Sequence, residues 1–568
     1  IQSRPDQDMR GNKIGSYDFG TRAKESKSVY GATLGGPIIK DKLFFFANFE
    51  YEKEPKQVIK WKASTDGVGD GQTISRTTEA DLQRVSDHLK SKYGYETGSY
   101  KDFPADMTNF KILGRIDWNI NNDNKFSLRY NYTKNADWTE PNGNSSDTGY
   151  RLNGMNRVSK YSMSYANSMY SMDNVVNSAT AELNSRFNDN MSNQILVTYS
   201  NIEDRRGTNS SIFPFIDIMA GYDSTGNIIR EPYISAGYEL FTYNNIVKNN
   251  VITVTDNFTY YYNAHKITAG ISYEYQNAGN AYMRNGTGYY RYASIDDFIN
   301  GAAPEAFALT YGNNGVEKPA SEVAFHQLGI YGQDEWKLAS NFKVTAGIRL
   351  DNVMFYNELM RNQAIYDLDF NGKKIDTGEW PSSKIQVSPR VGFTWDVFND
   401  KTLKVRGGTG LFTGRLPLVF FTNMPSNAGM IQSLQRVSTT YNTDGTIKNV
   451  DERLALLAGG MITDVDEMIK KLGFKTTVTP EDGSVPSGIA AVDPNFKMPQ
   501  VWKTSLAADY QVPVSFPFNV TVEGIFTKNI NAAMQLNYNM KDPDNTWARF
   551  SGKDTRYIYP DEVRYYAK

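Results

Sequence analysis

The sequence predicts an all-β fold, a large antiparallel β-barrel that crosses a membrane on its strands. Segments of about ten residues alternate apolar and polar side chains with a period of two, as in strands with one face toward lipid. The segments come in pairs joined by very short polar turns, and a much longer polar stretch separates each pair from the next. No apolar run approaches the roughly 18 residues of a transmembrane helix.

The first two strand pairs show the alternation most clearly. The first pair is GATLGGPII and LFFFANFEYE, joined by KDK, and its second segment places Phe45, Phe49 and Tyr51 on one face. Glu50 and Glu52 fall on the other face. The second pair is FKILGRIDWNI and KFSLRYNYT. The five further pairs are SATAELNSRF with MSNQILVTYS, VITVTDNFTYYY with KITAGISYEYQ, FHQLGIYGQDEWK with FKVTAGIRLDN, IQVSPRVGFTWDVF with KTLKVRGGTGLF, and VWKTSLAADYQV with FNVTVEGIFT.

The connections indicate an outer-membrane barrel with about fourteen strands in this chain. Turns within a pair take about two to five residues, and connections between pairs run from roughly 30 to 85, although long structureless loops are uncommon in soluble domains. Outer-membrane barrels combine short periplasmic turns with long extracellular loops. A soluble β-sandwich or propeller, the alternative, places turns about every 8–12 residues at both strand ends and turns polar faces outward. Here the apolar face carries Tyr and Trp near strand ends, as in membrane-interface girdles.

The long extracellular loops are expected to carry short helices and hairpins. The stretch from Thr78 to Tyr95 predicts a surface helix, with Thr78 and Asp81 as a capping box. DERLALLAGG and VDEMIKKLGF predict two shorter helices in the longest loop. Polar glycine turns between β-prone residues predict small hairpins in GYDSTGNIIREPY, DLDFNGKKID and YNTDGTIKN.

Composition narrows the classes of function. The 568 residues contain no cysteine, and the three histidines, His88, His265 and His326, are far apart, which argues against thiolate or His-based metal and catalytic sites. The net charge of -2 argues against nucleic-acid binding. No two carboxylates of the polar faces are set apart as a catalytic pair. The GGTG stretch at 407–410 lacks the residues of a phosphate-binding loop. We therefore expect no enzyme activity and no cofactor.

A short acidic stretch, DLDFNG, matches the first half of a calcium-binding loop. The carboxylate that should complete the loop is missing, because Gly378 stands at that position. The pattern favours a type I′ hairpin turn at Asn371 and Gly372. The alternative that it leaves open is a structural calcium ion held by Asp367, Asp369 and Asn371.

The segment from Gly414 to Met430 directly follows a predicted strand, and it is apolar although Pro417 and Pro425 interrupt it. A free loop of this composition would expose large apolar side chains to water. We therefore expect it to pack onto the barrel wall, onto a plug, or onto a solute. If it contacts a solute, the candidate ligand-binding residues are Arg415, Phe420, Phe421 and Asn423.

Several blocks of the chain resemble the Oar-like TonB-dependent receptors of the Bacteroidetes, a group of Gram-negative bacteria. The resemblance rests on several blocks taken in this order, with loops unmatched between them. The blocks are YGATLGGPIIKDKLFFFANFEYEKE, LGIYGQDEWKLASNFKVTAGIRLD, SPRVGFTWDVFNDKTLKVRGGTGLFTGRLPLVFFTN, DPNFKMPQVWKTSLAADYQVP and VTVEGIFTKNINAA.

This resemblance implies a barrel of 22 strands (about eight more than are found here), filled by an N-terminal plug. It implies outer-membrane localisation with multiple crossings, contact with outer-membrane lipid, and a TonB complex that acts through an N-terminal region absent from this chain. A surface lipoprotein partner is also expected. In this layout residues 1–30 lead into the barrel, 31–532 form its hairpins and long loops, and 533–568 form an extracellular loop leading to missing strands. The plug and any N-terminal domain are absent from this chain.

The leading functional hypothesis is active transport, in which the extracellular loops bind a bulky solute (a peptide, a glycan or a protein) and the receptor imports it to the periplasm. Aromatic side chains suit all three solutes. An adhesin, a secretion-associated structural barrel and a passive porin are the alternatives. A plug domain and a TonB-contacting segment in the precursor would favour active uptake over these.

Overall fold

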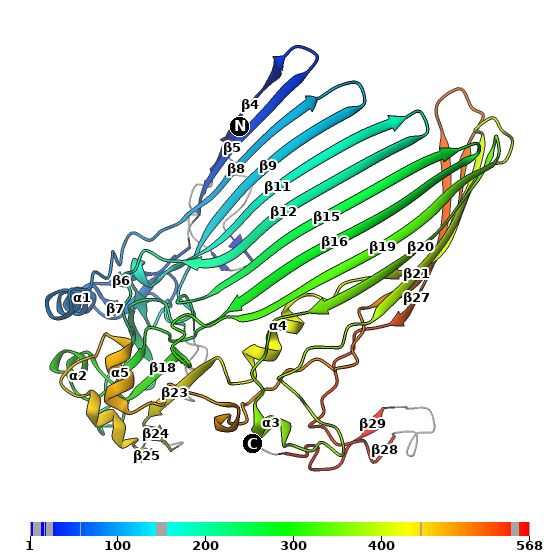
Figure 1. Cartoon of the computed structure of the whole chain (residues 1–568). Helices are drawn as coiled ribbons and strands as arrows, with labels where there is room; N and C mark the ends of the chain where they lie inside the picture. The colour runs from blue at the N-terminus through cyan, green and yellow to red at the C-terminus, as the bar shows by residue number, and fades with distance from the viewer. Residues whose placement is uncertain are drawn as a thin grey trace.

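The computed structural model describes residues 2–3, 13–15, 17–18, 26–56, 58–143, 156–442, 446–546 and 556–566. Its main feature is a 15-stranded sheet in which neighbouring strands follow one another in chain order, seen as a curved wall in Figure 1. A short strand, β1 (Gln2–Ser3), pairs with the first long strand. The long strands are β4 (Lys27–Ile39), β5 (Leu43–Pro55), β8 (Asp106–Asn119), β9 (Asn124–Thr139), β11 (Tyr170–Asn188), β12 (Met191–Gly207), β15 (Ile246–Tyr262), β16 (His265–Ala281), β19 (Ser321–Ala339), β20 (Phe342–Phe355), β21 (Ile385–Asp396), β22 (Leu403–Thr413), β26 (Gln500–Gln511) and β27 (Asn519–Asn531).

The seven predicted hairpins are confirmed, and the all-β antiparallel barrel architecture with them. Each predicted segment lies within or overlaps one long strand, and every neighbouring pair of strands is antiparallel. Asp41, Asn263 and Asn399 adopt left-handed φ values of 60°, 50° and 59° in the short turns. Asp and Asn tolerate this conformation better than other non-glycine residues, which explains their abundance in the turns. In the described part of the chain, β4 and β27 are the outermost long strands.

Several strands extend beyond their predicted ends on the loop side. The strands β11 and β19 each have 19 residues, more than the roughly ten needed to cross the apolar layer of a membrane. Their extensions, such as Tyr170–Asn177, mix small, polar and apolar residues on both faces. The alternation of apolar and polar residues that marks a lipid-facing strand therefore ends before the backbone hydrogen bonds between the strands end.

The two faces of the sheet differ in character as the alternation predicts. Large apolar side chains on one face are exposed in mid-strand, and no other described part of the chain covers them. The opposite face carries polar and charged side chains. We call the apolar face the outer wall and the polar face the inner wall. The exposed apolar residues of the outer wall include Ile112, Leu128, Val197, Ile252, Ile271, Ile330, Ile348, Val391 and Leu506.

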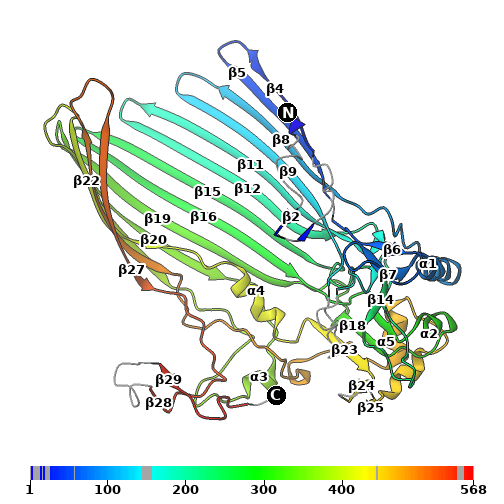
Figure 2. The same ribbon diagram turned by 180° about the vertical axis from the view of Figure 1, so that it is seen from behind.

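The long loops gather at one end of the wall, where they fold together (Figures 1 and 2). Strands from four different loops form a second, six-stranded sheet with the order β10-β14-β13-β17-β18-β23. We call this sheet and the helices packed on it the loop domain. The strands are β10 (Met163–Ser164), β13 (Phe215–Met219), β14 (Pro232–Ala236), β17 (Tyr289–Tyr292), β18 (Ala306–Gly312) and β23 (Gln432–Ser438); the helices are α1 (Glu79–Tyr93), α2 (Ile295–Asn300), η3 (Glu452–Leu457) and α5 (Val465–Leu472).

The helices of the loop domain bury apolar faces against the second sheet. Leu82 and Leu89 of α1 and Met468 of α5 join one core with Ile218 and Tyr290 of the sheet, all fully or almost fully buried. The three helices predicted in the loops are confirmed, η3 as a 3₁₀-helix. The sequence did not predict their assembly into one domain, because the pairing of strands from separate loops depends on distant partners.

The N-terminus of α1 differs in one detail from the predicted capping box. The hydroxyl of Thr78 accepts a hydrogen bond from the Asp81 backbone amide at 3.0 Å, as expected. The Asp81 carboxylate, however, accepts the hydroxyl of Tyr233 at 2.6 Å, and the Thr78 amide donates to Tyr233 as well. Hydrogen bonds to Tyr233 of the second sheet therefore replace the expected bond from the Thr78 amide to the Asp81 carboxylate.

The remaining elements are short. All three predicted hairpins have backbone hydrogen bonds across the turn. One has a bridge between Tyr222 and Ile228, and in the second Phe370 donates to the Lys373 carbonyl at 3.0 Å. The third pairs β24 with β25, and its tip at 443–445 lies outside the described residues. No helix in the described ranges is long and apolar enough to span a membrane. The short elements are β2 (Lys13–Ile14), β3 (Tyr17–Asp18), β6 (Lys62–Ser64), β7 (Ile74–Thr78), η2 (Ala166–Ser168), α3 (Gln363–Tyr366), α4 (Val419–Ser426), β24 (Thr440–Tyr441), β25 (Ile447–Asn449), η4 (Pro480–Asp482), β28 (Asn545–Thr546) and β29 (Tyr557–Ile558).

Candidate functional site

The inner wall is a hydrated surface lined by ion pairs, some between neighbouring strands and some within one strand. Most of the paired side chains are between a quarter and a half exposed. Exposed pairs of this kind each contribute about 0–1 kcal/mol, so they shape a polar surface more than they stabilise the sheet. The pairs include Lys111–Glu50 at 2.6 Å, Arg115–Asp117 at 2.7 Å, Arg349–Asp351 at 2.8 Å and Arg406–Asp509 at 3.1 Å.

The segment after β22 packs onto this wall, as the sequence predicts. Its helix α4 contacts β16 and β19, and it lies beside the loop end of the wall in Figure 1. Just before the helix, the exposed Arg415 makes an ion pair with Glu274 of β16, whose side chain is only 11% exposed. This pair ties the segment to the inner wall.

The four predicted ligand-binding residues do not share one environment. Phe421 is fully buried, with its ring centroid 5.2 Å from that of Phe355 and 5.9 Å from that of Phe496. Phe420 is 37% exposed and Asn423 is half-buried. In this structure Arg415, Phe420 and Asn423 can be reached by a solute, whereas Phe421 anchors the helix. Their role in ligand binding stays a prediction.

Substitution of Phe420 and Phe421, one at a time, distinguishes a side chain that packs the helix onto the wall from one that is exposed to a solute. Phe421→Ala is expected to lower the free energy of unfolding by about 3–5 kcal/mol, because it empties a buried aromatic site. Phe420→Ala is expected to cost less than about 1 kcal/mol, since its ring is partly in solvent. Hydrogen exchange of residues 414–430 measures both. Equal protection in the two variants would contradict this assignment.

The acidic stretch at 367–372 forms a tight turn. Asn371 and Gly372 have φ values of 59° and 79°, which is the positive pair that a type I′ turn requires. The Asp369 carboxylate accepts the Gly372 amide at 2.6 Å, and Asp367 accepts the side-chain amide of Gln363. No cluster of three or more His or acidic side chains suited to a metal is found in the described part of the chain. The calcium site stays a prediction.

A groove of about 620 Å³ opens on the inner wall across β19 to β27. Gly347, Gly392 and Gly408 form part of its floor, and because glycine has no side chain the space above these positions stays open. Arg349, Arg390, Lys503 and Glu523 supply its charges, and the guanidinium of Arg349 lies 5.1 Å from the centre of the Tyr331 ring. Alternation places such residues on the polar face, but it does not show that they line one groove.

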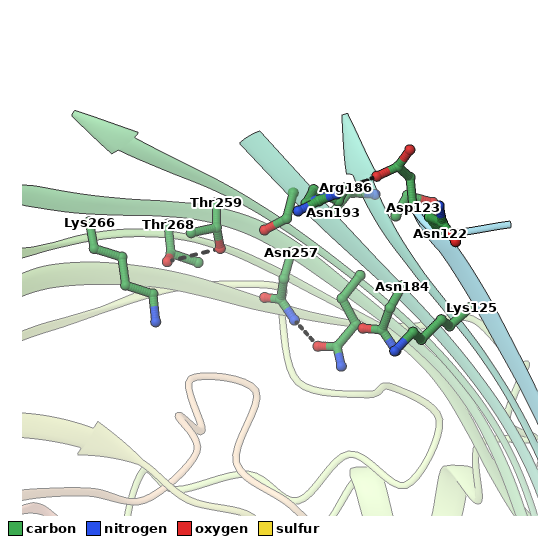
Figure 3. Close-up of a pocket in the computed structure, with 13 residues that line it drawn as sticks. Asn122, Asp123, Lys125, Asn184, Arg186, Asn193, Asn257, Thr259, Lys266 and Thr268 are labelled. Carbon is green, nitrogen blue, oxygen red and sulfur yellow. Dashed lines mark hydrogen bonds and ion pairs between the residues drawn. The ribbon is translucent and has the colours of Figure 1, made fainter. Parts of the chain in front are cut away.

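A second cavity, of about 630 Å³, lies near the short turns of β9, β11, β12, β15 and β16. Amide and hydroxyl groups dominate its lining, and Asn257 donates to Gln194 at 3.4 Å. Lys125, Asn184, Asn257 and Lys266 project from neighbouring strands into this space (Figure 3). Such a lining can hydrogen-bond a polar solute or a polar protein segment at this end of the inner wall.

The loop domain contains a buried ion pair that the sequence did not reveal. Two nitrogens of Arg157 contact the two carboxylate oxygens of Asp217, at 2.9 and 2.8 Å. The side chains are 0% and 2% exposed. Ser235 and Tyr289 also donate to Asp217, at 2.7 and 2.8 Å. The carboxylate thereby joins β13, β14 and β17, and no local motif marks a pair whose members are 60 residues apart.

This pair makes the loop domain sensitive to acid. Burial is the largest single influence and would raise the pKa of Asp217. The charge of Arg157 and the hydrogen bonds from Arg157, Ser235 and Tyr289 together outweigh burial, so the pKa lies below its usual value. A carboxyl with a depressed pKa stabilises the fold above the unfolded value of about 3.9, and this stability is lost as the pH falls below it. We expect hydrogen-exchange protection of β13 and β17 to fall below about pH 4. Asp217→Asn should abolish that step, and an unchanged step would contradict this origin.

Comparison with known proteins agrees with the fold. The family model described as an outer membrane beta barrel domain matches residues 73–567. The chain is 30% identical over 119 residues to the TonB-dependent transporter Oar of Myxococcus xanthus, a match that covers 21% of this chain and 10% of that protein. The matched stretch thus spans only about a tenth of the length of this curated relative. The matched family and this relative are a membrane barrel and a transporter, not enzymes.

Solved structures that are similar to the chain include two outer-membrane transporters. The outer membrane transporter YddB from Escherichia coli shares 11% identity, with 89% of this chain and 46% of that chain covered and a TM-score of 0.49. The FrpB iron transporter from Neisseria meningitidis shares 10% identity, with 92% and 53% covered and a TM-score of 0.41. Because the family model covers most of the chain and the sheet has the strand order and faces of such a barrel, this chain belongs to the outer-membrane β-barrel domain family and lies in the outer membrane.

Proposed function

We propose that this chain forms most of the barrel of a TonB-dependent transporter, which binds a bulky solute at its loops and imports it to the periplasm. The observation that carries the proposal is the inner wall, a polar surface with two cavities that runs from the loop domain to the short turns. A peptide, a glycan or a protein would meet charged and hydrogen-bonding groups along this path. The match to the Oar transporter supports dependence on TonB.

The proposal includes a narrower family and its partners. Membership of the Oar-like receptors is supported by the matching sequence blocks and by the Myxococcus relative, which carries the name Oar. The assignment to the Bacteroidetes rests on the sequence blocks alone. Such a receptor would be driven by a TonB complex, and a surface lipoprotein would cover its loops. Outer-membrane lipid would surround the outer wall.

Transport requires binding that differs between two states of the receptor, not catalysis. The α4 segment is suited to the first contact, because Arg415 and Phe420 are exposed while Phe421 holds the helix on the wall. A solute that bound Arg415 in place of Glu274 would release one attachment of this segment. The loop domain would hold the surrounding loops in fixed positions, since its buried core joins several of them.

The test compares cells that carry the natural full-length protein with a strain from which its gene is deleted. The measured quantity is the accumulation of fluorescent peptides and oligosaccharides of graded length in the periplasm, with and without a protonophore. We expect uptake of at least one probe class above the deletion background, and we expect the protonophore to abolish it.

Two outcomes would contradict active transport. Uptake that continues without the proton gradient would identify a passive pore. Surface binding of probes or cells without any uptake would favour an adhesin, for which the large folded loop domain would supply the contact surface. Deletion cells that re-express the protein serve as the control for indirect effects of the deletion.

A further inference from the structure

Two cations lie side by side in the groove on the inner wall. The strand register pairs Arg390 of β21 with Gly410 of β22, and Gly410 in turn with Lys503 of β26. Adjacent strands are about 4.8 Å apart, so the backbones of Arg390 and Lys503 lie roughly 10 Å apart across a glycine. Both side chains are exposed and both line the groove. Their long side chains can reach the same bound group.

The guanidinium of Arg390 is held in place on one side. Its central carbon lies 4.5 Å from the centre of the Phe412 ring, and a Cβ built on Gly410 would come within 2.9 Å of its Cγ. Stacking on a ring occupies one face of a guanidinium but leaves its N–H edges available. Arg390 is therefore oriented for a ligand before the ligand arrives.

The other charges of the groove are paired. Arg349 contacts Asp351 at 2.8 Å. Glu523 lies 3.7 Å from Arg406, which also contacts Asp509. Among the described residues, no carboxylate lies within ion-pair distance of Arg390 or Lys503, in contrast to most of the inner-wall cations. The groove thus has an excess of positive charge at one place.

We propose that this groove binds an oxyanion, a carboxylate or phosphate group carried by the transported solute. A guanidinium edge pairs with two oxygens of such a group, and an ammonium adds a second charge-assisted hydrogen bond. Gly392 and Gly408 leave room on the floor for the body of the solute. This inference rests on the proposed transport function and narrows its solute to an anionic one.

The test measures binding of citrate and of inorganic phosphate to the purified full-length protein by calorimetry at low salt. Arg390→Gln with Lys503→Gln is expected to weaken binding of at least one probe by about tenfold or more, as loss of charged hydrogen bonds implies. Arg129→Gln is the matched control. It removes another exposed inner-wall cation on β9, away from the groove, and should change affinity less than about twofold.

The outcomes show whether the bound anion comes from a solute or from the protein itself, and they separate the anion-binding proposal from the transport proposal. Equal affinity in the wild type and the double variant would overturn the proposal. The control is that both proteins show the gel shift on heating that marks a folded barrel. Unchanged affinity accompanied by easier proteolysis of a lumen-filling segment would also overturn the proposal, since an acidic side chain of the protein would then be the natural occupant. Anion binding that depends on Arg390 and Lys503 would stand even if energy-dependent uptake were absent, and uptake without anion binding would refute only this inference.

Discussion

Arg157→Ala is expected to unfold the loop domain while the barrel wall remains folded. The substitution leaves the Asp217 carboxylate buried without its cation, and breaking a buried pair in this way costs about 3–5 kcal/mol. The cost falls on the second sheet, because Ser235 and Tyr289 donate to the same carboxylate from neighbouring strands. Hydrogen exchange followed by mass spectrometry should show loss of protection in β13, β14 and β17 and retained protection in the wall strands β11, β12, β15 and β16.

An exposed pair in the same domain provides the control. Arg84 contacts Asp296 at 2.7 Å, but the side chains are 51% and 70% exposed. Arg84→Ala should therefore change stability by less than about 1 kcal/mol. Replacement of both buried partners, as in Arg157→Met with Asp217→Leu, should recover part of the loss because no unpaired charge remains. Equal effects of Arg157→Ala and Arg84→Ala would contradict the structural role of the buried pair.

Ile330→Arg is expected to destabilise the barrel in a membrane by about 2–4 kcal/mol, the cost of an arginine on the lipid face near mid-depth. Ile330 lies in the middle of β19, is 51% exposed, and is paired in register with Ile271 and Leu350 on the same outer wall. Urea unfolding of the full-length protein in lipid vesicles measures the loss.

Gln333→Arg tests the other face of the same strand. Gln333 is exposed and lines the groove of the inner wall, where water can solvate an added guanidinium. Its cost should lie within about 1 kcal/mol. A similar loss of unfolding free energy in both variants would show that lipid does not contact one face and water the other. The assignment of outer and inner walls would then be wrong.

The strands of the wall could be predicted because lipid imposes a local rule on them. Each residue on the outer wall must be apolar whatever its partner is, so a pattern such as Val391, Phe393 and Trp395 identifies a strand without knowledge of its neighbours. The short turns could be predicted for a similar reason, since Asn263 and Asn399 satisfy a local backbone requirement. The register of neighbouring strands then follows from the hairpins.

The loop domain and the cavities depend on contacts between distant residues, and no local rule reveals them. The parallel pairing of Phe215 with Tyr289 joins two loops, and the Arg157–Asp217 pair gives no periodic signal. In the α4 segment the sequence indicated packing on the wall but did not separate buried Phe421 from exposed Phe420. Which of the two rings is buried depends on which face of the helix each residue occupies. Pro417 and Pro425 obscure that periodicity in the sequence.

The most direct test of the account is the orientation of the barrel, because transport from outside requires the loop domain to face the medium. The chain has no cysteine, so single cysteines can be introduced at Ser224, exposed in a turn of the loop domain, and at Asp189, exposed in the turn between β11 and β12. In intact cells producing the full-length protein, a membrane-impermeant maleimide should label Ser224→Cys. It should label Asp189→Cys only after the outer membrane is permeabilised. Labelling of Asp189→Cys but not Ser224→Cys in intact cells would contradict the account.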